Sequence, residues 1–429
     1  MRLISPPARS YYAASAPAGG EAARAPLAGE CRADVAVVGA GIAGCSAALH
    51  LAQRGFEVVV LEAHSVGYGA SGRSGGQTIF GLAASQKSLI AQVGRDDARR
   101  LFEMSVEALD LTQSLIREHR IECDYRPNHL HVATRPRHLG ELREWIRELH
   151  EEYHYGSARL LDRAELGEHV RSERYLGGLI DTRSGHLHPL KYTQGIARAA
   201  EAAGARIFEH TRALHYEQGA ELRVHTERGV VRCRHLVLCA NAYIGALAPR
   251  LARRILGVGT YIIATRPMQA ERARALLPSN AAVADMNWIL DYFRLSADRR
   301  ILFGGRVSYS ALEPPRLAES MRRRMLRVFP QAADLAVEYT WGGLLDITLS
   351  RAPDFGRLAP NVFYLQGFSG HGMSLSALAG KLIAEALAGT AERFEVFARL
   401  PHREFPGGAL LRRPMLMLAM LYYRLKDLL

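Results

Sequence analysis

Lysine is scarce in this sequence, and dense clusters of positive charge are missing. Only four of the 55 basic residues are lysine, so arginine carries most of the charge behind a formal net charge of +12. No basic block is interleaved with aromatic residues, so we expect no nucleic-acid partner. We expect most arginines to lie on a solvated surface. The alternative is that some of them face an anionic cofactor or an acidic substrate.

Paired cysteines are missing as well. The five cysteines are scattered, odd in number and never arranged as C-x-x-C, so neither a zinc site nor a thioredoxin-like redox pair is supported. Cys45, Cys233 and Cys239 stand in apolar runs and are expected to be core thiols. This usage predicts a reducing compartment, which we take as the cytoplasm, and no bound metal.

Long hydrophobic runs are the third absence. No segment reaches the roughly 18 apolar residues of a membrane span, and the N-terminus lacks the continuous apolar stretch of a signal peptide. Residues 391–429 form the expected C-terminal helical tail, which contains the apolar stretch PMLMLAMLYY. We expect a packed terminal helix there, with an interfacial membrane helix as the alternative.

A glycine-rich turn near the N-terminus gives the first indication of function. Residues 33–64 have the pattern of a buried strand, a glycine turn, a helix and a second buried strand. Gly39 permits the tight turn, Gly41 lets the backbone approach a pyrophosphate, and Gly44 lets the helix pack closely on the strand.

The start of the helix and the end of the second strand in residues 33–64 also suit the binding of a dinucleotide. Ile42 and Ala43 begin the helix, whose N-terminus offers N–H donors and the positive end of the helix dipole. Glu62 ends the second strand, where a carboxylate can accept hydrogen bonds from ribose hydroxyls. Together these residues predict a dinucleotide-binding site.

The order of elements predicts an interrupted domain. The 429 residues suffice for about two to three domains, and strand–helix–strand units recur near 33–64, 190–245 and 361–388, with mixed segments between them. We expect a discontinuous Rossmann-like α/β domain with an inserted mixed-sheet (α+β) substrate domain. The expected division is an extended N-terminal arm (1–32), a cofactor domain (33–90, 184–255 and 340–390) and a substrate domain (91–183 and 256–339).

Two further glycine-rich stretches favour FAD over NAD as the dinucleotide. The loop GASGRSGGQ occupies 69–77, and GFSGHGM occupies 367–373, between a strand and a helix late in the chain. A glycine turn in that setting presents backbone N–H groups to an electron-rich ligand. An NAD-dependent dehydrogenase would leave both stretches unexplained.

At this point the sequence resembles the superfamily of FAD-dependent amine and D-amino-acid oxidases, which includes glycine oxidase and sarcosine oxidase. Within it, the likeness is closest to the gamma-glutamylputrescine oxidase branch, and it covers nearly the whole chain. The stretches that carry it are SYYAASA (10–16), the glycine fingerprint, SGRSGGQ (71–77), GHLHPLKYTQGIARAA (185–200), LCANAY (238–243), DYFRLSADRRILFGG (291–305), GFSGHGM (367–373) and LRRPMLMLAMLYYRLKDLL (411–429).

The resemblance implies a set of FAD-binding positions. The fingerprint glycines would bind the pyrophosphate and Glu62 the adenosine ribose, while Ala213 would meet the adenine and Ala240 would end a strand beside the cofactor. Further residues would lie along or face the flavin: Ser71, Arg73, Ser74, Gly76, Gln77, Gly370, His371, Gly372 and Met373. A helix N-terminus at the last four would stabilise negative charge on the reduced flavin.

Two departures from the pattern matter. Monomeric sarcosine oxidases attach FAD to a cysteine in the C-terminal third, but here no cysteine follows Cys239, so we predict non-covalent FAD. Those enzymes also carry a lysine that helps oxygen to react, on a strand similar to 301–306. This strand has none, so Arg306 is the expected substitute, and oxygen or another electron acceptor remains open.

The resemblance also implies the chemistry. Hydride leaves an amine carbon for flavin N5, and the resulting imine hydrolyses to an aldehyde and ammonia, with hydrogen peroxide as the product of oxygen. Gamma-glutamylputrescine or a related polyamine conjugate is the leading small-molecule substrate. Glycine, sarcosine or a D-amino acid is the second possibility, and a flavin-binding redox scaffold the third.

Candidate catalytic and substrate residues follow from this chemistry. His371 and Arg306 are the candidate catalytic residues, with His371 as a neighbour of the flavin rather than a general base. Aromatic side chains could pack a cationic polyamine by cation–π contact, or could simply be core, and Arg306 and Arg351 could anchor a carboxylate. The aromatic candidates are Tyr261, Trp288, Tyr292 and Trp341.

Overall fold

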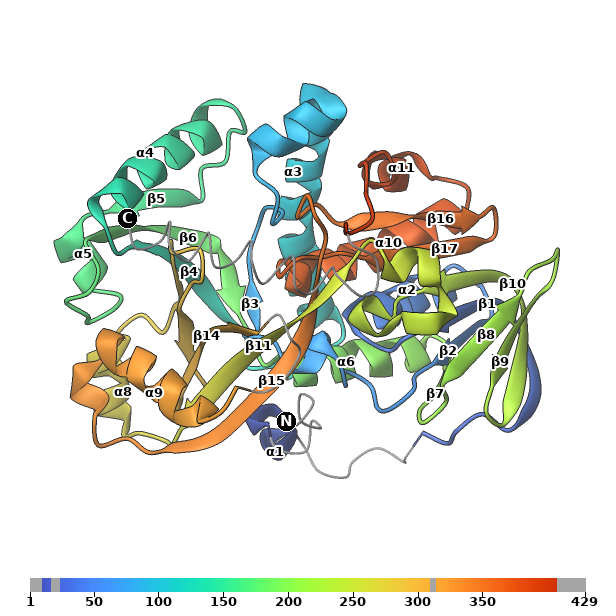
Figure 1. The fold of residues 1–429 in the computed structure, drawn as a ribbon, viewed down its shortest axis with the longest axis horizontal. Helices are drawn as coiled ribbons and strands as arrows, with labels where there is room; N and C mark the ends of the chain where they lie inside the picture. Colours follow the sequence, from blue (N-terminus) through green and yellow to red (C-terminus); the bar gives the residue numbers. More distant parts are fainter. Residues whose placement is uncertain (1–9, 17–23, 309–313, 407–429) are drawn as a thin grey trace.

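The computed structural model describes residues 10–16, 24–308 and 314–406, with the side chains of Arg306 and Val307 outside that description. Two large sheets lie side by side, one toward each end of the molecule (Figure 1). Each sheet has its own apolar clusters. This confirms the expected fold class, a Rossmann-like domain combined with a mixed-sheet domain.

The first sheet is built around a parallel core. The central strand β1 pairs in parallel with β10 on one side and β2 on the other, and the antiparallel strand β16 closes one edge. A hairpin of β8 and β9 extends from β10. In spatial order the strands are β16 (Asp354–Ala359), β17 (Val362–Gln366), β10 (Gly229–Leu238), β1 (Gly29–Val38), β2 (Val58–Leu61) and β7 (Arg206–Phe208), with β8 (Ala213–Glu217) and β9 (Leu222–Thr226) in the hairpin.

Helices cover one face of this sheet with small apolar side chains. Buried residues of β1 and β2 share one apolar cluster with those of α2, α3, α6 and α10. The other face packs against the β8–β9 hairpin and the segment that follows β10. The helices are α2 (Ile42–Ala52), α3 (Gln86–Glu118), α6 (Pro189–Ala202) and α10 (Gly372–Leu387). The short helices α7 (Pro249–Ala252) and α11 (Glu392–Ala398) add buried side chains to the clusters on the two faces.

The second sheet is mostly antiparallel. Strands β13 and β14 form a hairpin with its turn at SADRR, and among the described strands of this sheet only β12 and β4 pair in parallel. Its strands are β15 (Val337–Ile347), β11 (Leu256–Thr265), β14 (Ile301–Ser308), β13 (Tyr292–Leu295), β12 (Ala282–Asp285), β4 (Arg126–Ala133), β6 (Gly177–His186) and β3 (Gln77–Thr78), with β5 (Ala158–Leu161) beside β6. Its helices are α4 (Pro136–Glu151), α5 (Arg163–Gly167), α8 (Ala270–Leu276) and α9 (Leu317–Val328).

Some expected boundaries differ from the observed elements. Strand β6 crosses the expected boundary at 183/184 and β15 crosses that at 339/340, yet both lie wholly in the second sheet. β15 belongs to the second sheet because it pairs with β11 along its length, from Leu256↔Ile347 to Thr265↔Val337, with one register shift near the end. The division into two domains stays a prediction.

The two terminal segments also differ in detail from expectation. The N-terminal arm is not simply extended, because α1 (Tyr11–Ser15) is helical and β1 begins at Gly29. At the other end, α11 lies within the expected helical tail. Residues 407–429, including the apolar stretch, lie outside the described residues.

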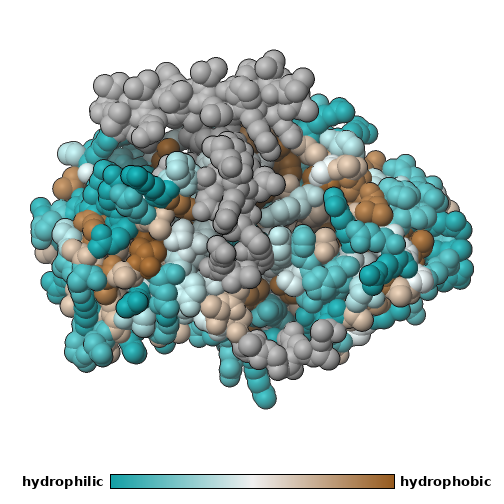
Figure 2. Space-filling view, turned by 60° about the horizontal axis from the view of Figure 1, so that its bottom comes forward, coloured by the Kyte–Doolittle hydropathy of each residue, from teal (hydrophilic) through white to brown (hydrophobic). Residues whose placement is uncertain are grey.

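Hydrophilic residues are spread over the face shown in Figure 2, and hydrophobic ones form small separate patches. Among the described side chains only Arg73, Arg294 and Arg300 are buried arginines, which fits the expectation that most arginines meet solvent. In the part of the chain that the structure covers, no helix is both long and apolar enough to cross a bilayer.

We predict that adding one methyl group at Gly380 destabilises the fold. A Cβ there would lie 2.4 Å from the backbone nitrogen of Ala47 in α2, and the backbone cannot yield as a side chain can. Gly380→Ala is expected to cost about 1–3 kcal/mol in the free energy of unfolding, measured by urea denaturation.

The matched control is Gly140, a helical glycine of α4 whose added Cβ would meet nothing within 4 Å. Gly140→Ala is expected to stabilise the protein by up to about 1 kcal/mol, because alanine has the better helix propensity. Equal effects of the two substitutions would contradict the tight crossing of α10 and α2.

Candidate active site

The turn between β1 and α2 has contacts that only glycine allows. Gly39 has a φ of 103°, and a Cβ on it would lie 2.7 Å from the carbonyl oxygen of Cys239, just after β10. A Cβ on Gly44 would lie 1.9 Å from the carbonyl oxygen of Gly39. The N-cap of α2 is Gly41, which supplies no side-chain cap. The first turn of α2 therefore meets the sheet edge with donors available to an anion.

Ser71 reaches this turn from the loop that follows β2. The backbone N–H of Ile42 donates to Ser71 Oγ over 3.0 Å. A Cβ on Gly41 would lie 2.8 Å from the same oxygen. Ile42 and Ala43 lie at the start of α2, as expected. The structure thus brings the glycine fingerprint and the loop at 69–77 together.

Glu62 lies at the other side of the same turn. One carboxylate oxygen accepts from the N–H of Ala40 over 2.8 Å, and the other accepts from that of His64 over 2.9 Å. Burial raises the pKa of this carboxyl. The two backbone bonds fix the carboxylate in place and leave lone pairs free for a hydroxyl donor.

The two candidates for the adenine end share one apolar cluster. Ala240 follows β10, where its Cα would lie 3.4 Å from a Cβ on Gly39. Ala213 begins β8 in the hairpin beside β10. Both pack against buried residues of β1 and β2. Ala240 is therefore in direct reach of the fingerprint turn.

The late glycine turn meets the loop at 69–77. Ser74 Oγ lies 3.0 Å from Met373 Sδ. Gly370 has a φ of 97° and His371 is the N-cap of α10, which Gly372 begins. Two stretches some 300 positions apart in the sequence thus lie in contact, and the side of the site opposite the fingerprint is formed between them.

Further residues of the loop are held by surrounding groups. Arg73 is buried, with its guanidinium 4.5 Å from the ring centre of Tyr68 and donating to a backbone carbonyl over 3.3 Å. Gly76 has a φ of 70°, and a Cβ there would lie 2.1 Å from the carbonyl oxygen of Leu187. Gln77 lies in β3 of the second sheet, where its side-chain amide donates to the carbonyl of Val283 over 3.3 Å.

His371 is kept uncharged by its surroundings. Its backbone N–H donates to the carbonyl of Phe368 over 3.0 Å, whereas its buried Nδ1 has no hydrogen-bond partner in the structure. Burial and, second, the charge of Arg351 lower the pKa of His371 to about 4. A neutral ring with an unsatisfied nitrogen suits contact with a polar ligand.

Two more histidines, on β4, lie beside this group and were not expected from the sequence. His129 Nε2 donates to Gln77 Oε1 over 3.1 Å, and its ring centre lies 4.6 Å from that of His131. Burial and then the neighbouring His371 lower the pKa of His131 to about 4. The signal available in the sequence was the HLH alternation of β4, which places both rings on one face.

The comparisons with known proteins bear on this site. The profile of a family described as DAO, FAD dependent oxidoreductase, matches residues 34–386. The chain belongs to this family. It is 42% identical to gamma-glutamylputrescine oxidoreductase of Escherichia coli, with 97% of this chain and 98% of that protein aligned. It is 40% identical to the probable oxidoreductase OrdL of Haemophilus influenzae, over 92% of each chain.

Solved structures of the DAO fold agree with the architecture. Glycine oxidase from Bacillus cereus superposes with a TM-score of 0.72 at 21% identity, covering 86% of this chain and 99% of that one. L-amino acid deaminase from Proteus vulgaris gives a TM-score of 0.71 at 19% identity, covering 88% and 99%. These likenesses establish the shared fold.

The residues present fit the FAD on which this DAO family depends. The glycines at 39 and 41 leave open backbone where any side chain would intrude, and the uncapped start of α2 offers donors for a pyrophosphate. The unsatisfied Nδ1 of His371 lies at the other glycine turn. The chain therefore provides one polar site for each end of an elongated cofactor, while the individual contacts stay predictions.

The candidate substrate residues differ in how far they are exposed. Tyr261 and Trp341 are buried, Tyr261 in the core of the second sheet. Tyr292 packs beside Gly75, where an added Cβ would lie 2.7 Å from its ring. Trp288 is 50% exposed, with the Arg351 guanidinium 5.9 Å from its ring centre.

Of the substrate candidates, the structure therefore brings Trp288 and Arg351 together at an accessible position. Arg306 is part of β14, and its side chain lies outside the described residues. Its roles in catalysis and in binding a carboxylate remain predictions.

We predict that Gly41→Val abolishes flavin retention without unfolding the protein. The added Cβ would meet only the end of the Ser71 side chain, which can rotate, whereas the isopropyl group would block approach of a pyrophosphate. Visible absorbance after gel filtration measures bound flavin, and thermal melting of the apoprotein measures the fold. A folded variant with full flavin content would contradict the assignment.

A second prediction concerns pH. Because the pKa of folded His371, about 4, lies below the usual value of about 6.5, the unfolded chain binds more protons between these values. The stability that this group contributes is present above about pH 6.5 and is lost as pH falls toward 4. When the pH falls from 7.5 to 5, the free energy of unfolding should therefore drop further in wild type than in His371→Asn, by about 1–2 kcal/mol.

Urea denaturation at the two pH values tests this. The same substitution at the exposed residue His154, measured under the same conditions, is the control for exchanging a histidine for an asparagine. An unchanged pH dependence in His371→Asn would show that the ring is not held neutral.

Proposed function

We propose that this FAD-dependent enzyme oxidises the C–N bond of an amine, with gamma-glutamylputrescine or a related polyamine conjugate as the leading substrate. The observation that carries the proposal is the 42% identity to gamma-glutamylputrescine oxidoreductase over nearly the full length of both chains. The glycine fingerprint and the late glycine turn, which the fold brings to one site, support it.

The bound FAD would supply the two-electron acceptor for hydride from the amine α-carbon. The chain's own residues supply position and electrostatics. Gly39, Gly41 and the start of α2 would hold the pyrophosphate, and Ser74 and Met373 would lie beside the flavin ring. The N-terminus of α10 places the positive end of a helix dipole where negative charge develops.

The uncharged histidines suit an amine that must react as the free base. Because burial lowers the pKa values of His131 and His371 to about 4, both rings are neutral at neutral pH, and neither repels a cationic substrate. Hydride loss and proton loss together convert the amine to an imine, which water hydrolyses to an aldehyde and ammonia. Oxygen or another acceptor takes up the electrons, and oxygen yields hydrogen peroxide.

The accessible pair of Trp288 and Arg351 suits the glutamyl end of a gamma-glutamyl amine, where an ammonium and a carboxylate stand on one carbon. The indole face attracts an ammonium group, and the guanidinium binds a carboxylate. Oxidase activity toward glycine, sarcosine or a D-amino acid is the second hypothesis, and the fold shared with glycine oxidase supports it.

An anaerobic substrate panel tests the proposal. We expect gamma-glutamylputrescine to bleach the flavin absorbance near the visible maximum at a lower concentration than putrescine, glycine, sarcosine or D-alanine. Faster bleaching by an amino acid would favour the second hypothesis. Bleaching by no compound would favour a redox scaffold, and peroxide release in air would separate an oxidase from a dehydrogenase.

We also predict that the FAD is non-covalent. No cysteine follows Cys239, and burial raises the pKa of the Cys239 thiol to about 12, which leaves it a poor nucleophile. Trichloroacetic acid should therefore leave the yellow colour in the supernatant. Colour that remains with the precipitated protein would contradict this prediction.

A further inference from the structure

The helix α1 is more deeply buried than a terminal arm requires. Tyr11 is 5% exposed and Tyr12 is not exposed at all. Ser10 is buried as well, and its hydroxyl caps the helix by accepting from the N–H of Ala13 over 3.0 Å. A five-residue helix is marginal alone, so its contacts with the rest of the protein must hold it in place.

Tyr12 contacts an arginine that organises the flavin-facing loop. Arg294 of β13 is 3% exposed and donates to the Tyr12 hydroxyl over 3.0 Å. The same guanidinium donates to the carbonyls of Gly75 over 2.7 Å and of Leu187 over 2.9 Å. One side chain thus joins α1, the loop at 69–77 and the segment before α6.

A second route leads from Tyr12 to the same loop. Its ring packs edge-on against Trp341 of β15, with the centres 5.2 Å apart. Trp341 Nε1 donates to the carbonyl oxygen of Arg73 over 3.0 Å. Tyr12 therefore touches both side chains that hold the carbonyls on either side of Ser74, the residue in contact with Met373.

We propose that Tyr12 is a positioning residue for the flavin site. It fixes Arg294 and Trp341, and through them it sets the backbone between residues 73 and 75 that lies along the cofactor. The inference rests on the FAD dependence of the family and on the proposed location of the flavin. The N-terminal segment is then part of the cofactor site, although no atom of α1 needs to contact FAD.

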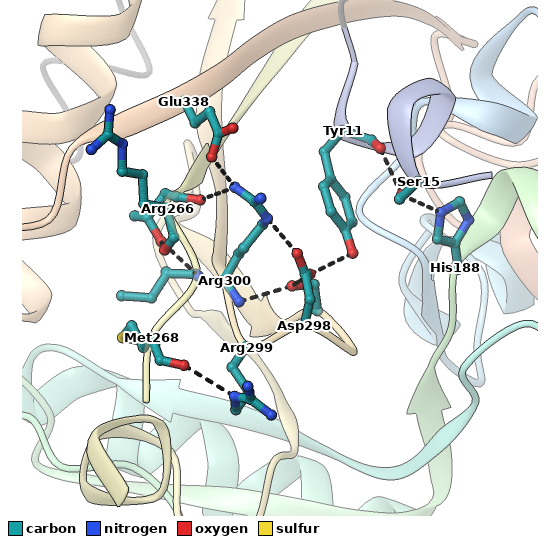
Figure 3. A network of polar contacts seen from close by, with 12 residues as sticks. Tyr11, Ser15, His188, Arg266, Met268, Asp298, Arg299, Arg300 and Glu338 are labelled. Carbon is teal, nitrogen blue, oxygen red and sulfur yellow. Dashed lines mark hydrogen bonds and ion pairs between the residues drawn. The ribbon is translucent and has the colours of Figure 1, made fainter. Parts of the chain in front are cut away.

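The neighbouring tyrosine on α1 has a different role, which Figure 3 shows. The Tyr11 hydroxyl donates to Asp298 over 2.7 Å, and Asp298 is paired with Arg300 over 2.6 Å. On the other side of the helix, Ser15 Oγ lies 3.1 Å from His188 Nε2. These contacts attach α1 to the β13–β14 turn and to the start of α6 without reaching residues 73–75.

This difference gives a matched pair of variants, Tyr12→Phe and Tyr11→Phe. Each removes one buried hydroxyl from the same helix, so both should lower the melting temperature of the apoprotein by a similar amount. Only Tyr12→Phe removes a partner of Arg294. We expect it to raise the Kd of the apoprotein for FAD roughly tenfold, the effect of losing one hydrogen bond to a charged group, while Tyr11→Phe changes it less than twofold.

Quenching of flavin fluorescence on titration with apoprotein measures the Kd. Arg294→Lys is the second variant, because it keeps the charge but cannot make the same set of bonds; it should raise the Kd at least as much as Tyr12→Phe. The visible spectrum of the bound flavin should shift in both variants and not in Tyr11→Phe.

Equal Kd values for the two tyrosine variants, or wild-type affinity in both Tyr12→Phe and Arg294→Lys, would overturn the inference. Failure of the wild-type protein itself to bind FAD would instead contradict the proposed function, which requires FAD. The two failures are therefore distinguishable.

Discussion

The site depends on the close crossing of α2 and α10. Gly380 lies so near α2 that a side chain would strike its backbone, and Ser46 Oγ donates across the crossing to the carbonyl of Ala377 over 2.6 Å. Because α2 begins at one glycine turn and α10 at the other, this contact sets the distance between the two turns. A cofactor that spans both turns needs this fixed distance, and packed helices provide it better than a loop could.

The second sheet acts on the same site from the other side. Trp341 and Arg294 project from β15 and β13 and hold two carbonyls of the loop after β2. The loop is thus fastened at Ser71 to the start of α2 and near Ser74 to the second sheet. A site formed between two sheets needs such links, because each sheet packs its own core and would otherwise be free to shift.

Much of this arrangement could be predicted from local sequence, and the remainder depends on distant partners. The fingerprint follows from glycines at fixed spacing after a strand, and the β13–β14 hairpin follows from alternation around SADRR. Pairing with β11 places β15 in the second sheet, and no local sequence pattern encodes this pairing. His129 and His131 gain meaning only when β4 is placed beside Gln77. Tyr12 stands in an Ala- and Pro-rich segment that favours an extended arm.

The buried arginines show why composition alone could not settle what the arginines do. The expected alternatives were a solvated surface or an anionic ligand, but Arg294 takes a third role, since its fork of donors satisfies backbone carbonyls and a tyrosine hydroxyl. A lysine has one nitrogen on a flexible stem and could not bind these separated acceptors at once. A buried guanidinium is costly unless its donors are satisfied, so the carbonyls of the loop must stay where Arg294 can reach them. The same requirement that makes this arginine tolerable in the interior therefore fixes the shape of the loop at the proposed flavin site.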